Sequence, residues 1–171
     1  MDSYNLDEWK VASRLDVKVK SGEQKETVEN FEIIEISEGE LFPIYNPGDK
    51  EANLRIIFTP KSIANDNKYN FPSTKFYIYS KKGEDLEITS ALGIKEFSFD
   101  EEDKHIVIDS YTHLISGLNE DKKLSGKVYN KYHIAGDFFE IPKSKHEDQL
   151  YLKIENGVSG TWKLEYKFYY V

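Results

Sequence analysis

Histidines are the first residues to test for metal or acid–base chemistry, and their spacing supports neither. The chain has four: His105, His113, His133 and His146. No two of them follow a His-x-His or His-x-x-x-His pattern, which would bring two ring nitrogens together on one strand or one helix turn. We therefore expect surface or rim histidines. The absence of cysteine from the sequence excludes disulfides and thiolate ligands.

The acidic run Asp100–Asp103 is the second candidate, because its carboxylates could bind calcium. A calcium loop usually needs glycine to turn its backbone inward, and this run has none. We expect it to be the solvated tip of a hairpin between Phe97–Phe99 and Ile106–Ile108.

Catalytic motifs are missing from the sequence. It contains no Gly-x-Ser-x-Gly elbow, no Gly-x-Gly-x-x-Gly and no phosphate-loop pattern. No particular pair of carboxylates is marked for glycoside hydrolysis. The sequence therefore predicts a protein that is not an enzyme and uses no metal or cofactor.

The charge of the chain restricts its partners. A formal net charge of -8 over 171 residues repels a phosphate backbone, so nucleic acid is not an expected partner. No stretch approaches about 18 consecutive apolar residues, so no membrane-spanning helix is expected. The acidic, polar start Met1–Glu8 does not look like a signal peptide.

Alternation of apolar and polar residues along most of the chain predicts strands. It is clearest at the C-terminus, where one face is expected to carry Trp162, Leu164, Tyr166, Phe168 and Tyr170 and the other Lys163, Glu165 and Lys167. Leu150, Leu152 and Ile154 precede a glycine-containing loop, which predicts a hairpin over 149–170.

Further strands follow from the same pattern. A second hairpin is expected where Phe76–Tyr79 and Leu86–Thr89 flank Gly83, and another strand at Leu54–Phe58. Residues 63–70 read as an exposed loop. About ten short strands with turn signals between them predict an all-β fold, an antiparallel β-sandwich. We expect one main domain over 40–171, with 1–39 as an extension or a remnant of a preceding domain.

Two local features have roles that the pattern suggests. Asn46-Pro47-Gly48-Asp49 predicts a type II turn in which Gly48 takes a positive φ. Tyr77 and Tyr79 alternate with Phe76 and Ile78, so their strand is aromatic or apolar on both faces. Either both faces are covered, or the tyrosines form an aromatic interaction surface that stacks on sugars or anchors a protein.

Several segments, in order, resemble the distal tail (Dit) proteins of long-tailed phages. They are Phe42–Asp49 with Ala52–Phe58, then Leu86–Thr89, Ile106–Ser110, Gly136–Pro142 and the closing strand Leu164–Tyr170. Carried over by motif, the family positions are Asn46, Gly48, Asp49, Asp109, Phe138, Phe139 and Pro142. The family often continues Pro-Gly-x-Asn after its paired aromatics, where this chain has Pro142–Lys145.

The resemblance implies a galectin-like, jelly-roll-like sandwich that serves as a structural part of a tail tip or baseplate. It places the protein in the virion, after assembly in the host cytoplasm. Implied partners are other tail-tip proteins and a receptor-binding protein. The parent protein would be a homo-hexamer, while this portion alone could be a monomer.

Two other classes stay open on the residues alone. A carbohydrate-binding module of a cell-wall or receptor-binding protein would use exposed aromatics, with Tyr77 and Trp162 as the residues to test, and cell-wall glycan as its ligand. A hydrolase on a β-sandwich is the third class.

Overall fold

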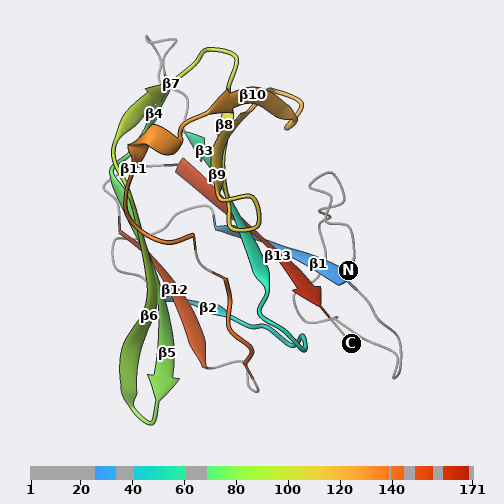
Figure 1. The fold of residues 1–171 in the computed structure, drawn as a ribbon, viewed down its shortest axis with the longest axis vertical. Coiled ribbons are helices and arrows are strands. Elements are labelled where there is room, and N and C mark those ends of the chain that lie inside the picture. The colour runs from blue at the N-terminus through green and yellow to red at the C-terminus, as the bar shows by residue number, and fades with distance from the viewer. Residues whose placement is uncertain are drawn as a thin grey trace.

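The structure is a computed structural model, and it describes residues 26–33, 41–60, 69–138, 140–144, 149–155 and 160–169. Two antiparallel sheets pack face to face, and a two-stranded sheet lies at one end (Figure 1). The predicted all-β, antiparallel sandwich is confirmed. No helix in these ranges is long and apolar enough to cross a membrane.

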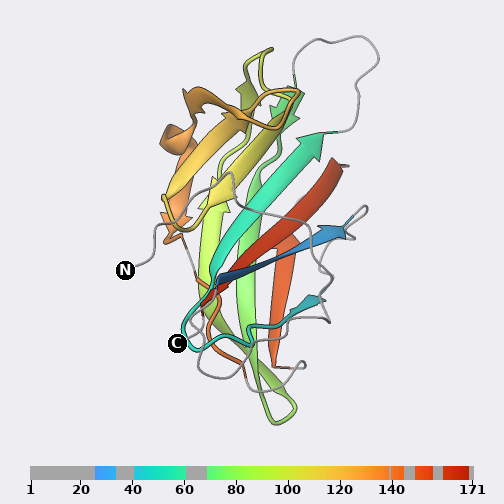
Figure 2. The ribbon, with the colours of Figure 1, turned by 90° about the vertical axis from the view of Figure 1, so that its right-hand side faces the viewer.

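The first sheet has six strands. In spatial order they are β1 (Glu26–Ile33), β13 (Gly160–Tyr169), β3 (Asn53–Pro60), β8 (His105–Asp109), β9 (Leu114–Leu118) and β10 (Leu124–Val128). Figure 2 shows this sheet in front, with the second sheet behind it.

The second sheet has five strands. They are β11 (His133–Gly136), β6 (Asp85–Ile94), β5 (Thr74–Lys82), β12 (Leu150–Glu155) and β2 (Leu41–Ile44). The small sheet pairs β4 (Tyr69–Phe71) with β7 (Phe97–Phe99), and a 3-10 turn, Asn130–Tyr132, precedes β11.

The core lies between the sheets because the strands alternate. On β12, Leu150, Leu152 and Ile154 are buried while the residues between them are half-buried. Trp162 on β13 is 1% exposed and packs on Phe58 and Phe76 at ring-centroid distances of 4.7 and 5.6 Å. Since Phe58 belongs to one sheet and Phe76 to the other, this contact joins them.

The expected hairpin around Gly83 is confirmed. β5 and β6 pair in antiparallel register, with an irregularity between Ile78 and Tyr79, and Gly83 has φ 63° at the tip. Glycine adopts this left-handed backbone without steric cost.

The hairpin predicted over 149–170 is wrong. Both segments are strands, but β12 pairs with β5 and β2, whereas β13 pairs with β3 and β1. The chain therefore crosses from one sheet to the other between them. Leu152 and Leu164 both face the core, one from each sheet. Each strand therefore alternates apolar and polar residues, just as the two strands of a hairpin would.

The hairpin predicted between Phe97–Phe99 and Ile106–Ile108 is also wrong. β7 pairs with β4, and β8 pairs with β3 and β9. A short turn predicts a change of direction, and it does not specify which strand becomes the partner.

Residues 1–25 and 34–40 of the predicted extension lie outside the described residues, and so do residues 63–68 of the predicted loop at 63–70. The last two residues of that loop belong to β4, so the loop prediction is wrong there. β1 pairs with β13 along its length, so residues 26–33 belong to the six-stranded sheet.

Leu152→Ala and Leu164→Ala should each lower the free energy of unfolding by about 2–5 kcal/mol, because each removes a buried side chain from a packed core. Their exposed fractions are 1% and 0%. Leu124→Ala, at a residue 52% exposed on β10, is the matched control and should change stability by less than about 0.5 kcal/mol. Urea unfolding measures all three, and equal losses would contradict the assignment of the core.

Candidate functional site

The histidines do not form a metal site in the described residues. His105 is half-buried with Nδ1 2.6 Å from the Thr59 hydroxyl, and burial lowers the pKa of its ring. His113 and His133 lie near the Phe138 ring, at centroid distances of 5.4 and 5.3 Å. No group of three or more His, Asp or Glu in the described ranges could hold a metal ion. His146 lies outside them.

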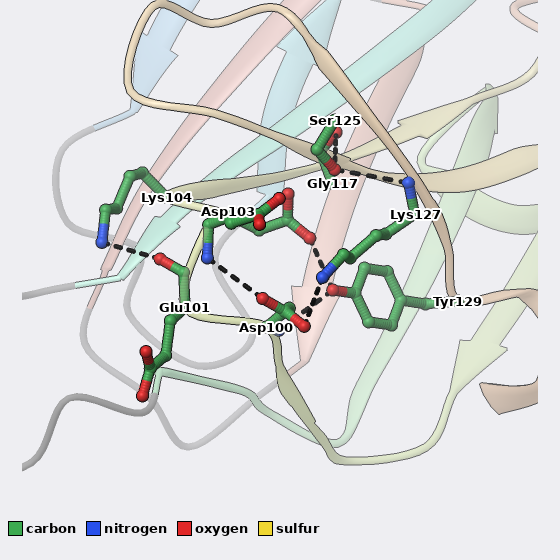
Figure 3. A network of polar contacts seen from close by, with 9 residues as sticks. Asp100, Glu101, Asp103, Lys104, Gly117, Ser125, Lys127 and Tyr129 are labelled. Atoms are coloured by element: carbon green, nitrogen blue, oxygen red, sulfur yellow. Dashed lines mark hydrogen bonds and ion pairs between the residues drawn. The ribbon is translucent and has the colours of Figure 1, made fainter.

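The acidic run is only partly solvated, which corrects the prediction. Asp100, Glu101 and Glu102 are exposed, but Asp103 is 0% exposed. Its Oδ2 accepts a hydrogen bond from the Tyr129 hydroxyl at 2.5 Å, as Figure 3 shows. Burial and this bond raise the pKa of Tyr129 well above its ordinary value.

The same network also holds Asp100, at the exposed end of the acidic run. The backbone N–H of Asp100 donates to the Tyr129 hydroxyl at 3.0 Å, and Lys127 forms an ion pair with the Asp100 carboxylate. The hydrogen bond from Lys127 lowers the pKa of Asp100. Asp103 is thus held by contacts within the protein, which fits a structural role for the run.

Gly117 on β9 makes room for the Asp103 carboxylate. A Cβ built at this position would lie 2.0 Å from Asp103 Oδ2 and 2.3 Å from Oδ1. Such distances are far below van der Waals contact, so a larger residue does not fit unless Asp103 moves. No sequence pattern identifies Gly117 or Tyr129 as a contact of Asp103, because both residues lie far from Asp103 along the chain.

A second polar cluster lies on the six-stranded sheet, on the side away from the sandwich core. Arg55 on β3 stands between Glu165 on β13 and Asp109 on β8 in the strand register. Its guanidinium lies 3.3 Å from Glu165, and Lys163 lies 3.6 Å from the same carboxylate. Glu165 and Asp109 are 3% and 2% exposed.

Burial dominates the electrostatics of this cluster. It raises the pKa of both Glu165 and Asp109, and the nearby Arg55 charge only partly offsets the effect. Asp109 also accepts hydrogen bonds from the backbone N–H of Tyr111 and Thr112, at 2.7 and 3.2 Å. The predicted motif aspartate therefore closes the turn after β8.

Asn46 connects two segments that are distant in sequence. It is 0% exposed, and its Nδ2 donates to the carbonyls of Lys50 and Ile141 at 2.9 and 3.0 Å. Its backbone N–H donates to the Ser144 hydroxyl at 3.0 Å. The motif around Asn46 and the motif around Pro142 therefore meet in space.

Gly48 does not adopt the positive φ that the predicted type II turn requires. The expected type II geometry is therefore wrong. A Cβ at this position would lie 2.8 Å from the Tyr169 carbonyl oxygen, and the N–H of Asp49 donates to that oxygen at 2.7 Å. Close approach of β13, rather than backbone conformation, makes glycine necessary here.

Three further motif positions are less buried than Asn46 and Asp109. Asp49 is exposed and contributes its backbone to the contact with β13, while Phe138 and Pro142 are half-buried. Phe139 lies outside the described residues. No shared site joins these side chains to Asp109 in the contacts described.

Tyr77 and Tyr79 point away from the core on β5 and are half-buried, with ring centroids 6.1 Å apart. Their neighbours on β12 are Lys153 and Tyr151, which lie directly opposite in the register. Lys153 forms an ion pair of 3.0 Å with Glu155, and their hydrogen bond raises the pKa of Lys153. The structure thus brings three tyrosines together on the outer face of the five-stranded sheet.

The fold and these clusters describe a β-sandwich stabilised by buried polar contacts, and comparison with known proteins finds a likeness of fold. The chain matches no family model and no curated protein. Among solved structures it is similar to the Dit protein of phage SPP1, described as a paradigm of the hub adsorption apparatus in phages that infect Gram-positive bacteria. The TM-score is 0.50 and the sequence identity 12%.

The alignment covers 84% of this chain and 47% of SPP1 Dit, so it takes in about half the length of that protein. At this identity the likeness is one of fold. It agrees with the family resemblance of the sequence motifs at the level of architecture.

Tyr129→Phe should lower the free energy of unfolding by about 1–3 kcal/mol, because it leaves the buried Asp103 carboxylate without its hydroxyl donor. Tyr132→Phe is the matched control. Its ring stacks on the same Phe97, and its hydroxyl has no hydrogen bond within the described residues. Denaturant unfolding of both variants is the measurement, and an equal change in the two would contradict the role of Asp103.

Asp109→Asn should change how stability depends on pH. Because the folded-state pKa of Asp109 is raised, its contribution to stability is full below the unfolded value of about 3.9 and is lost as pH rises through the folded value. The stability of the wild type relative to Asp109→Asn should therefore fall as the pH rises above about 4.

Urea unfolding at several pH values tests this expectation. The side-chain amide that replaces the carboxylate keeps an oxygen acceptor for the Tyr111 N–H, so the turn should survive. Asp121→Asn, in the exposed β9–β10 loop, is the control. Parallel pH profiles for wild type and Asp109→Asn would contradict the burial effect.

Proposed function

We propose that this chain is the outer β-sandwich domain of a phage distal tail protein, a structural component of the tail tip or baseplate. The observation that carries the proposal is the fold shared with SPP1 Dit over 84% of the chain. The ordered motifs from Phe42–Asp49 to Leu164–Tyr170 support it independently, since they are features of the sequence rather than of the fold.

The physical character of the domain suits a structural part. Trp162 packs edge-on against Phe76 of the opposite sheet at a centroid distance of 5.6 Å, and within its own sheet it lies 4.7 Å from Phe58. Phe97 of the small sheet stacks on Tyr132 of the 3-10 turn at 4.5 Å. Aromatic pairs of this geometry add stability beyond the area that they bury. A virion component must keep its shape during assembly and host attachment.

The proposal includes a location and partners. The domain would reside in the virion at the tail tip, after assembly in the host cytoplasm. Its partners would be other tail-tip or baseplate proteins and a receptor-binding protein. The parent protein would form a homo-hexamer, and this portion alone a monomer.

The carbohydrate-binding alternative loses one of its two test residues. Trp162 is 1% exposed in the core and cannot stack on a sugar. Tyr77 remains a candidate for contact with a sugar, because its ring lies on the outer face of β5.

Immunogold labelling tests the structural role. Antibodies raised against the purified chain should label one end of the tail of phage particles produced by a host that carries this sequence. Pre-incubation of the antibody with purified chain is the control and should remove the label. Finding the protein only in the particle-free fraction of the lysate would overturn the proposal.

A further inference from the structure

The outer face of the five-stranded sheet carries an ordered pattern of tyrosine and lysine. On β5, Phe76 and Ile78 face the core at 0% exposure, so Lys75, Tyr77 and Tyr79 point outward. On β12, Tyr151, Lys153 and Glu155 point outward in the same way. We call these six residues the tyrosine–lysine face.

The strand register makes this face continuous. Tyr151 lies opposite Tyr79, Lys153 opposite Tyr77, and Glu155 opposite Lys75. Directly opposite residues in an antiparallel pair have Cβ atoms about 4.5–5.5 Å apart. The adjacent strands add Ile88, which is 56% exposed and opposite Tyr79, and Leu41, which is 39% exposed and opposite Lys153.

The charge of this face differs in sign from that of the chain. Lys153 forms an ion pair with Glu155, so the excess positive charge of this face comes from the exposed Lys75 and from the exposed Lys81, which continues the β5 row. The chain as a whole has a net charge of -8. The face is therefore complementary to an anionic partner. Its tyrosines offer flat rings on which apolar faces can stack.

Three anionic partners can be compared by chemistry. Protein interfaces are rich in tyrosine but poor in lysine, which argues against a protein surface. The overall negative charge opposes the dense phosphates of nucleic acid. A polysaccharide offers sugar rings for the tyrosines, hydroxyl groups for Glu155, and widely spaced acidic groups for the lysines.

We propose that the tyrosine–lysine face binds an anionic polysaccharide. Tyr77, Tyr79 and Tyr151 stack on sugar rings, and Lys75 and Lys153 donate hydrogen bonds to its phosphate or carboxylate groups. This binding activity goes beyond the structural role and does not depend on it, so either can fail alone.

Titration of the full chain with defined polymers tests the proposal. The probes are a polysaccharide with one phosphodiester in each repeat of several sugars, hyaluronan as a carboxylate polysaccharide, dextran as the neutral polysaccharide and polyglutamate as an anion without sugar rings. One or both anionic polysaccharides should bind more tightly than dextran and polyglutamate, with affinity that falls as salt is raised.

Variants separate stacking from charge. The double change Tyr77→Ala and Tyr79→Ala should weaken binding about tenfold or more, equivalent to about 1.4 kcal/mol. Tyr77→Phe should retain it, because the aromatic ring is kept. Thermal unfolding of the double variant checks that it is folded. Lys75→Gln with Lys153→Gln should weaken binding and reduce its salt dependence. Tyr111→Ala and Lys123→Gln, exposed in turns of the other sheet, are the matched controls.

Three outcomes would overturn the proposal: no binding of either anionic polysaccharide, equal binding of polyglutamate, or full binding by the tyrosine double variant. Equal binding of polyglutamate would indicate an acidic protein partner instead.

Discussion

The packing of aromatic rings around Trp162 is the contact on which the rest of the structure depends. Trp162 contacts Phe58 of its own sheet, Phe76 of the opposite sheet and Phe71 of the small sheet, at centroid distances of 4.7, 5.6 and 6.0 Å. From Phe71 the contacts continue to Phe97, which stacks on Tyr129 at 4.9 Å and on Tyr132 at 4.5 Å. One connected set of rings therefore joins all three sheets.

Polar contacts then fix the edges of this apolar core. The hydroxyl of Tyr129 ends the aromatic set and holds the buried Asp103, which orders the acidic turn before β8. Asn46 joins the segment before β3 to the segment around Ile141. Buried polar groups of this kind cost free energy when they lack partners, so they restrict the chain to the arrangement that pairs them.

The two outer faces differ in character. On the six-stranded sheet, Ile57, Val107 and Leu118 are buried beside the Arg55–Glu165 pair. On the five-stranded sheet, the tyrosines are half-buried and Ile88 is more than half exposed. Accessible rings lie on the second face, which is why we assign the binding surface there.

The sequence by itself determined the elements and the class of fold. Alternation at Leu54–Phe58, at Leu150–Ile154 and at Trp162–Phe168 identified strands and their buried sides, because side chains of a strand point to opposite faces in turn. Gly83 at the tip of the β5–β6 hairpin is also predicted from local sequence, because a short turn there requires a positive φ, which glycine adopts easily. Such signals depend on neighbouring residues only.

Strand partners and polar contacts were decided by the tertiary structure. β12 and β13 have the pattern of a hairpin, yet they lie in different sheets, because burial of Leu152 and Leu164 is equally satisfied by facing each other across the core. Gly48 and Gly117 are required by atoms from β13 and from Asp103, which no local pattern reveals. Long-range pairing is set by packing that many residues share, whereas the alternation of a strand is a property of that strand alone.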